Sequence, residues 1–414
     1  MWPDLDLGER AKYLCKLIHS GCYTKKLLTM RWQYLNQEEI NGFDRYKYKS
    51  MDTSPVSNYI THPFWNFIVE YFPKWLAPNL MTFTGWGMLF MVYAVTSYYD
   101  PHLKAGLGPH TGYQVPGFWW MIFAAAQFIA HTLDGCDGKQ ARRTNSSSPL
   151  GELFDHGLDS MAIWLITLSL FCIFGHGSPS VTMLELYIMY FICLMGFFIA
   201  HWEKYNTGML YLPWAYDSSQ LMIALVYAVT CFTGVEFWKS GIPSVGISYM
   251  NVFRGTVYGS FITITLPMCI FNVYQAHVTN TCRSITPSEG MMPFLPIAAQ
   301  FLLFTTWVLI SPSNVLLNQP RLLLSAIGIV FSNITCRLIV STMCGEPCER
   351  FNILLYPLAA ILFVVPFLKA EGTEVTALVF YTFLVAVLHV HYGICVVNQL
   401  CDHFKIRCFS LKKP

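Results

Sequence analysis

Long apolar stretches recur along most of this chain, and they limit its fold more than any other feature. A helix needs about 20 apolar residues to cross the hydrocarbon core of a bilayer. Ten stretches approach that length, near residues 80–98, 117–134, 154–176, 183–203, 217–237, 255–275, 293–311, 321–343, 350–368 and 374–398. Only 12% of the residues are charged, whereas soluble domains carry about 25%. The sequence therefore predicts an all-α, polytopic membrane protein with about ten transmembrane helices.

The distribution of charge predicts how such a protein is oriented. The net charge of +2 is too small to indicate a nucleic-acid partner. Lysine and arginine favour short cytosolic loops, and they concentrate before the first apolar stretch, between the second and third, and after the last. The basic residues of the last two regions are Lys139, Arg142, Arg143, Lys405, Arg407, Lys412 and Lys413. We expect all three regions, and both termini, to lie on the cytosolic side.

Two segments precede the first apolar stretch. Residues 1–30 mix basic and apolar residues at partly helical spacing, which suits a membrane-surface helix or an unstructured tail. Residues 31–78 are polar at first and end in an aromatic band around Phe64, Phe67 and Tyr71. Because Trp and Tyr prefer the headgroup region of a bilayer, this band predicts an interfacial amphipathic helix, with aromatic core packing as the alternative.

Ionisable residues gather between the second and third apolar stretches. Asp134 and Asp137 are three residues apart and share one face of a helix. A second stripe, at spacings i, i+3, i+4 and i+7, contains Glu152, Asp155, His156 and Asp159. If the two segments pair across the short turn between them, the four aspartates converge, and cations are needed to neutralise them. This arrangement predicts oxygen ligands for two Mg²⁺ ions, with Mn²⁺ as an alternative.

The same stretch matches a known signature at every fixed position. It reads D-x-x-D-G-x-x-A-R, then eight residues, then G-x-x-x-D-x-x-x-D. This resembles the CDP-alcohol phosphotransferase family, whose members are membrane enzymes with two metal ions. The resemblance implies that the four aspartates hold the metals and that Gly138, Arg142 and Asn79 contact the CDP part of a donor substrate. From the residues alone, Asn79 suits a helix cap equally well, because it follows a proline.

Further segments point to one branch of that family. HPFWN at 62–66, WLAPN at 75–79, HWEKYNTG at 201–208 and HVHYG at 389–393 resemble the ethanolamine branch of the eukaryotic choline/ethanolamine phosphotransferase group. That branch transfers phosphoethanolamine from CDP-ethanolamine to diacylglycerol in the endoplasmic reticulum or Golgi membrane. The resemblance implies a site open to the cytosol, with choline or both headgroups as the alternative. Its selenoprotein members continue into a selenocysteine-containing tail, whose role is not carried over to this chain.

The catalytic base and the headgroup pocket are harder to assign. The acceptor hydroxyl must lose a proton, and His156 is the expected base, oriented by Glu152 one helical turn earlier. Alternatively, His156 supports the metal ligands and Asp159 is the base. Glu203 and Tyr205 are candidates for the headgroup amine, although charges at a helix end also extend toward the membrane surface.

These expectations divide the chain into four regions. After the extension (1–30) and the cytosolic or interfacial segment (31–78), residues 79–275 form the catalytic transmembrane helices. Residues 276–414 form C-terminal helices that serve as a scaffold, a lipid chamber or a homodimer interface. An ion-coupled transporter is the alternative from another class. The absence of a second polar cluster in the sequence argues against it, because transporters often have paired repeats.

Overall fold

The computed structural model describes residues 32–176, 181–212, 214–283, 286–367 and 372–411. The prediction for residues 1–30, and the two basic residues Lys412 and Lys413, lie outside the described residues.

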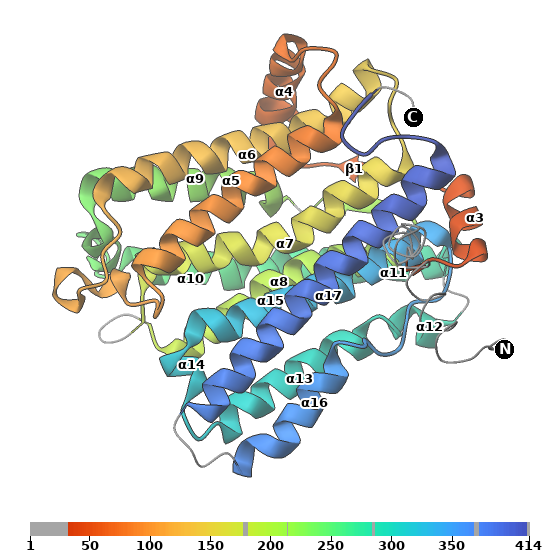
Figure 1. Ribbon diagram of the computed structural model, residues 1–414. Coiled ribbons are helices and arrows are strands. Elements are labelled where there is room, and N and C mark those ends of the chain that lie inside the picture. The colour runs from red at the N-terminus through yellow and green to blue at the C-terminus, as the bar shows by residue number, and fades with distance from the viewer. Residues whose placement is uncertain (1–31, 177–180, 213, 284–285, 368–371, 412–414) are drawn as a thin grey trace, which may run out of the picture.

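Helices form almost the whole of the described structure (Figure 1). The long or medium helices are α5 (Pro78–Tyr99), α6 (Gly117–Arg143), α7 (Pro149–Phe174), α8 (Met183–Thr207), α9 (Ala215–Thr233), α10 (Tyr249–Ser260), α11 (Leu266–Val278), α13 (Phe294–Ile310), α15 (Pro320–Cys344), α16 (Leu355–Val364) and α17 (Thr373–Phe404). The short helices are α3 (Gln37–Arg45), α4 (His62–Ile68), α12 (Pro287–Met291) and α14 (Val315–Asn318). Two three-residue strands, β1 (Ser50–Asp52) and β2 (Leu210–Leu212), pair in parallel, with Met51 opposite Tyr211.

Seven helices in the described part of the chain are long and apolar enough to cross a membrane. They are α5, α7, α8, Tyr249–Val278 (α10 and α11 together), Pro287–Ile310 (α12 and α13 together), α15 and α17. The other three predicted stretches are helical but are not among these seven. Two of them form α6, which carries several charges in its second half, and α9; the third, Leu355–Phe367, is shorter. The fold is therefore polytopic and α-helical, and ten spans are more than these helices support.

The core forms around α15, which is buried along nearly its whole length. It packs against α3, α7, α8, α13 and α17. Helices α5, α6, α7 and α9 form a second group in contact with it through α7. The N-terminal segment is tied to both groups, because α3 packs on α15 and β1 pairs with β2 just after α8. Residues far apart in sequence therefore meet at the end of the bundle where α6 ends and α7 begins.

The aromatic part of the segment predicted to be interfacial is helical, and its aromatic residues divide between core packing and exposure at the surface. Trp65 of α4 is buried, and its ring packs directly against Gly135 of α6. Phe67 and Tyr71 are 61% and 72% exposed. One face of this segment thus belongs to the protein core, and the other is free to meet a membrane surface.

Candidate active site

Three carboxylates converge where α6 ends and α7 begins. One oxygen atom from each of Asp134, Asp137 and Asp155 lies within 4.8 Å of the others. The short turn between the helices allows this, because Ser148 caps α7 by accepting a hydrogen bond from the Gly151 amide at 3.2 Å. Asp159 lies on α7 about one turn beyond Asp155 and lines the same cavity, but it is not part of the close set.

Neighbouring side chains hold two of these carboxylates in place. Thr82 Oγ1 donates to Asp137 Oδ2 at 2.5 Å, and Tyr216 OH donates to Asp134 Oδ2 at 3.1 Å. Asp155 Oδ1 is buried and has no hydrogen-bond partner. Three carboxylates this close, one buried and two partly buried, repel one another unless a cation neutralises them, and hard divalent cations prefer such oxygen ligands. The donor set therefore fits a divalent metal ion.

His156 and Glu152 lie on the same face of α7 but do not contact each other as the sequence predicted. His156 Nε2 is 3.7 Å from Asp155 Oδ2, and its Nδ1 is buried without a hydrogen-bond partner. Glu152 Oε1 instead accepts from Tyr46 OH at 2.6 Å and from Lys204 Nζ. Burial and the nearby carboxylate raise the pKa of Tyr46, so this phenol stays protonated and donates. The difference arises because a buried lysine from α8 pairs with the carboxylate, which spacing along α7 could not reveal.

A cavity of about 1370 Å³ joins the carboxylates to an apolar interior. Its polar end includes the four aspartates, His156, Arg142 and the turn residues 144–148. Its apolar part is lined by residues of α7, α8, α9 and α10, among them Ile163, Met189, Ile223 and Val257. Small-molecule pockets usually measure about 300–1,000 Å³. This cavity therefore suits a larger ligand that has a charged part and an apolar part.

The residues expected to contact CDP all line this cavity. They are Asn79, Gly138 and Arg142. The helix-cap reading of Asn79 is wrong, because Ala77 is the N-cap of α5 and no side chain caps that end. Asn79 Nδ2 instead lies 3.6 Å from Cys408 Sγ.

The segment after α17 also reaches this cavity, which sequence reasoning missed. Six of its residues line the cavity, namely Lys405, Ile406, Arg407, Cys408, Ser410 and Leu411. Phe409 anchors the segment by packing against Phe83 and Phe154, with ring centroids 5.5 Å apart in each case. No local pattern signals this placement, since the contacts join residues more than 250 positions apart in the chain.

The predicted headgroup residues do not line the cavity. Glu203 is buried and accepts a hydrogen bond from Asn272 Nδ2 of α11 at 2.6 Å. Tyr205 OH accepts from the Cys348 amide at 3.3 Å. Their helix instead directs Lys204 toward Glu152 and His201 toward His156, whose ring centroids are 5.4 Å apart. Glu203 is only 1% exposed, so its side chain does not extend to the membrane surface, which was the alternative.

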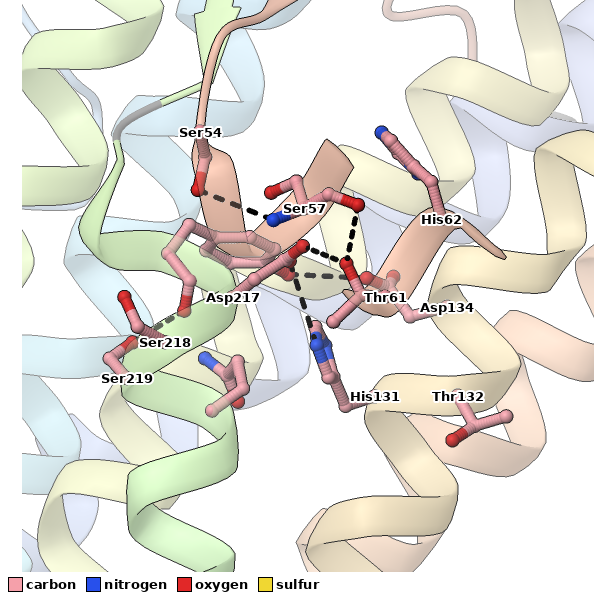
Figure 2. Close-up of polar contacts among 12 residues, drawn as sticks. Ser54, Ser57, Thr61, His62, His131, Thr132, Asp134, Asp217, Ser218 and Ser219 are labelled. Carbon is pink, nitrogen blue, oxygen red and sulfur yellow. Dashed lines mark hydrogen bonds and ion pairs between the residues drawn. The ribbon is translucent and has the colours of Figure 1, made fainter. Parts of the chain in front are cut away.

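A buried pair that the sequence did not single out lines the cavity as well. Asp217 of α9 lies 3.5 Å from His131 of α6, measured from Oδ1 to Nε2 (Figure 2). The local signal was present, because His131 falls one helical turn before Asp134. Its partner on a distant helix was not readable.

Comparisons with known proteins give matches over most of the chain. Residues 75–250 match the family model for CDP-alcohol phosphatidyltransferase. The chain is 43% identical over 385 residues to Ethanolaminephosphotransferase 1 of Mus musculus, which covers 92% of this chain and 96% of the mouse protein. The human protein of that name is 43% identical over 383 residues, with the same coverage. Choline/ethanolaminephosphotransferase 1 of Arabidopsis thaliana is 28% identical over 416 residues, covering 92% of this chain and 99% of the plant protein.

Proposed function

Because this chain belongs to the CDP-alcohol phosphatidyltransferase family, we propose that it transfers phosphoethanolamine from CDP-ethanolamine to diacylglycerol. The products are phosphatidylethanolamine and CMP. The family resemblance drawn from the sequence is thereby confirmed. The protein is an enzyme of this family and not the ion-coupled transporter considered as the alternative. The observation that carries the substrate assignment is the cavity, which joins a charged end suited to a nucleotide diphosphate to an apolar interior suited to acyl chains.

The metal site follows from the carboxylates. Asp134, Asp137 and Asp155, together with Asp159, would hold two Mg²⁺ ions, with Mn²⁺ as an alternative. When bound, the ions neutralise charge on the diphosphate and on the departing CMP. Thr82 and Tyr216 keep two of the carboxylates oriented by donating to them.

The chain's own residues supply the proton transfer and the donor contacts. The acceptor hydroxyl oxygen attacks the β-phosphorus, and the bond from that phosphorus to CMP breaks. His156 takes the hydroxyl proton as general base, since its unpartnered Nδ1 can accept a hydrogen bond. Glu152, paired with Lys204, lies about one helical turn before His156. Arg142 binds the donor phosphates by its planar fork, and Asn79 and Gly138 contact the CDP part.

The cellular setting is also part of the proposal. Nucleotide donors are made in the cytosol, so the charged end of the cavity faces that side. The membrane is that of the endoplasmic reticulum or Golgi. Residues 276–414 act as scaffold or lipid chamber, or as the interface of a homodimer.

The first test is Mg²⁺-dependent CMP release by the purified protein with diacylglycerol, comparing CDP-ethanolamine with CDP-choline. We expect the ethanolamine donor to be preferred. His156→Ala should lower kcat at least about 100-fold, because a general base contributes that much. Asp155→Ala should also lower kcat strongly, because it removes a ligand of the proposed metal site. Circular dichroism and thermal unfolding establish that each variant is folded.

Two results would change this assignment. If folded His156→Ala keeps most of its activity, Asp159 becomes the base and His156 a support for the metal ligands. If the wild-type protein releases no CMP from either donor, the proposed function is wrong.

A readout independent of turnover is the rise in Tm on adding Mg²⁺, since a ligand that binds only the folded state stabilises it. Asp155→Ala should reduce that rise.

A further inference from the structure

A second acidic site lies in the cavity beside the metal-binding carboxylates. Asp217 lies in the first turn of α9 and is only 4% exposed. Its Oδ2 accepts a hydrogen bond from Thr61 Oγ1 at 2.5 Å, and the same hydroxyl oxygen lies 3.4 Å from the Ser57 carbonyl (Figure 2). The carboxylate is thus fixed in position at the wall of the substrate cavity.

His131 faces the same place with unused hydrogen-bonding capacity. It is 5% exposed, lines the cavity, and neither of its ring nitrogens has a hydrogen-bond partner. Its contact with Asp217, at 3.5 Å, is longer than a good hydrogen bond. Buried polar atoms are nearly always partnered, so two such atoms at a cavity wall indicate that a ligand supplies the partner.

The distance from the reaction centre suits the headgroup of the donor. His131 precedes Asp134 by three residues on α6, and Tyr216, the neighbour of Asp217, donates to Asp134. The pair therefore lies about one helical turn from the carboxylates, and a turn rises about 5.4 Å. The arm from the β-phosphorus through oxygen and two carbons to nitrogen has a similar length.

We propose that Asp217 binds the ammonium group of the donor's headgroup, with Thr61 as its positioning residue, an inference that rests on the proposed function. A primary ammonium carries three N–H donors. The free side of the Asp217 carboxylate accepts one, and neutral His131 accepts another through a ring nitrogen. Trp65 packs edge-on against His131 with ring centroids 5.2 Å apart and also lines the cavity. Asp217 thereby replaces Glu203 and Tyr205 as the headgroup contact.

A purely structural role makes a different prediction. An acidic residue in the first turn of a helix is favourable through the helix dipole, and the Asp217–His131 contact also ties α9 to α6. Loss of a structural contact would affect all donors alike. Loss of an ammonium partner affects only donors that carry the charge.

The test measures formation of headgroup-labelled phosphatidylethanolamine from labelled CDP-ethanolamine, with unlabelled CDP-propanol as a competing ligand that matches the headgroup in shape but lacks its charge. For Asp217→Asn, we expect the KM for CDP-ethanolamine to rise roughly 10- to 100-fold, as for the loss of a charged hydrogen bond. The Ki of CDP-propanol and kcat should change less than about twofold. The KM for CDP-choline, which has no N–H donor, should rise less than that for CDP-ethanolamine. Thr61→Val should show the same pattern with smaller changes.

The matched control is Glu374→Gln. Glu374 is a buried carboxylate of α17 that accepts from Trp307 and Ser313 and does not line the cavity. This variant should leave the ratio of KM to Ki unchanged. If Asp217→Asn does not fold, Asp217→Glu and Thr61→Val carry the test.

Two outcomes would overturn the inference. One is an equal rise in the KM for CDP-ethanolamine and in the Ki of CDP-propanol in folded Asp217→Asn. The other is a selective rise in the KM for CDP-ethanolamine in Glu203→Gln, with no such rise in Asp217→Asn. Wild-type protein that releases no CMP from any donor would instead refute the proposed function, so the two failures are distinguishable.

Discussion

At the scale of single residues, the ion pair between Lys204 and Glu152 makes a sharp prediction. Lys204 is 2% exposed and sits near the rings of Tyr46 and Tyr48, at 5.8 and 5.3 Å from their centroids. Removing one member of a buried pair typically costs about 3–5 kcal/mol, because the other charge stays buried. We therefore expect Lys204→Met to lower Tm markedly in detergent and to lower activity through displacement of Glu152.

The double variant separates burial of charge from loss of packing. Lys204→Met combined with Glu152→Gln leaves no unpaired charge, so its Tm should exceed that of Lys204→Met alone. Arg254 and Glu185 form a more exposed pair, and Arg254→Met serves as the control, with a change of about 0–1 kcal/mol. A Tm for Lys204→Met equal to wild type would contradict the structure at this point.

At the scale of elements, the packing of α15 depends on one glycine. A Cβ atom at Gly328 would lie 2.4 Å from Trp164 Cγ of α7 and 2.6 Å from the Tyr190 hydroxyl of α8. We expect Gly328→Ala to destabilise the protein by about 1–3 kcal/mol, the usual cost of overpacking. Gly87→Ala on α5 is the control, because a Cβ there meets no atom within 4 Å. Thermal unfolding of both variants checks this, and equal Tm values would argue against the close approach of these helices.

At the scale of the whole molecule, the fold predicts which loops share a side of the membrane. The loop 101–116 follows α5, one of the seven apolar helices, and the turn 144–148 lies near the other end of α5, where Gly151 approaches Asn79. The segment after α17 lies at the end where Asn79 and the turn meet. With the carboxylates facing the cytosol, a glycan-acceptor cassette inserted after Thr111 should be glycosylated. The native acceptor pattern at Asn145 should not be. A mobility shift after glycosidase treatment measures both, and the reverse result would invert the orientation.

The sequence by itself determined the membrane-spanning helical class and the placement of the candidate metal-binding aspartates on two helices. Helical periodicity and hydropathy are local properties, so the stripes containing Asp134, Asp137 and Asp155 were readable without a fold. The close approach of these three carboxylates is as predicted. The predicted ten spans exceed the seven that the described helices support, because α6 carries charged residues in its second half and the helix Leu355–Phe367 is short.

Only the tertiary structure decided which distant residues complete the site. Lys204 forms an ion pair with Glu152, and Cys408 contacts Asn79. Glu203 accepts a hydrogen bond from Asn272 and does not line the cavity, whereas Asp217 does. Each of these contacts joins residues 50 or more positions apart in the chain. Such contacts depend on how whole helices pack, and on which buried charge finds a partner there, rather than on any spacing within one segment.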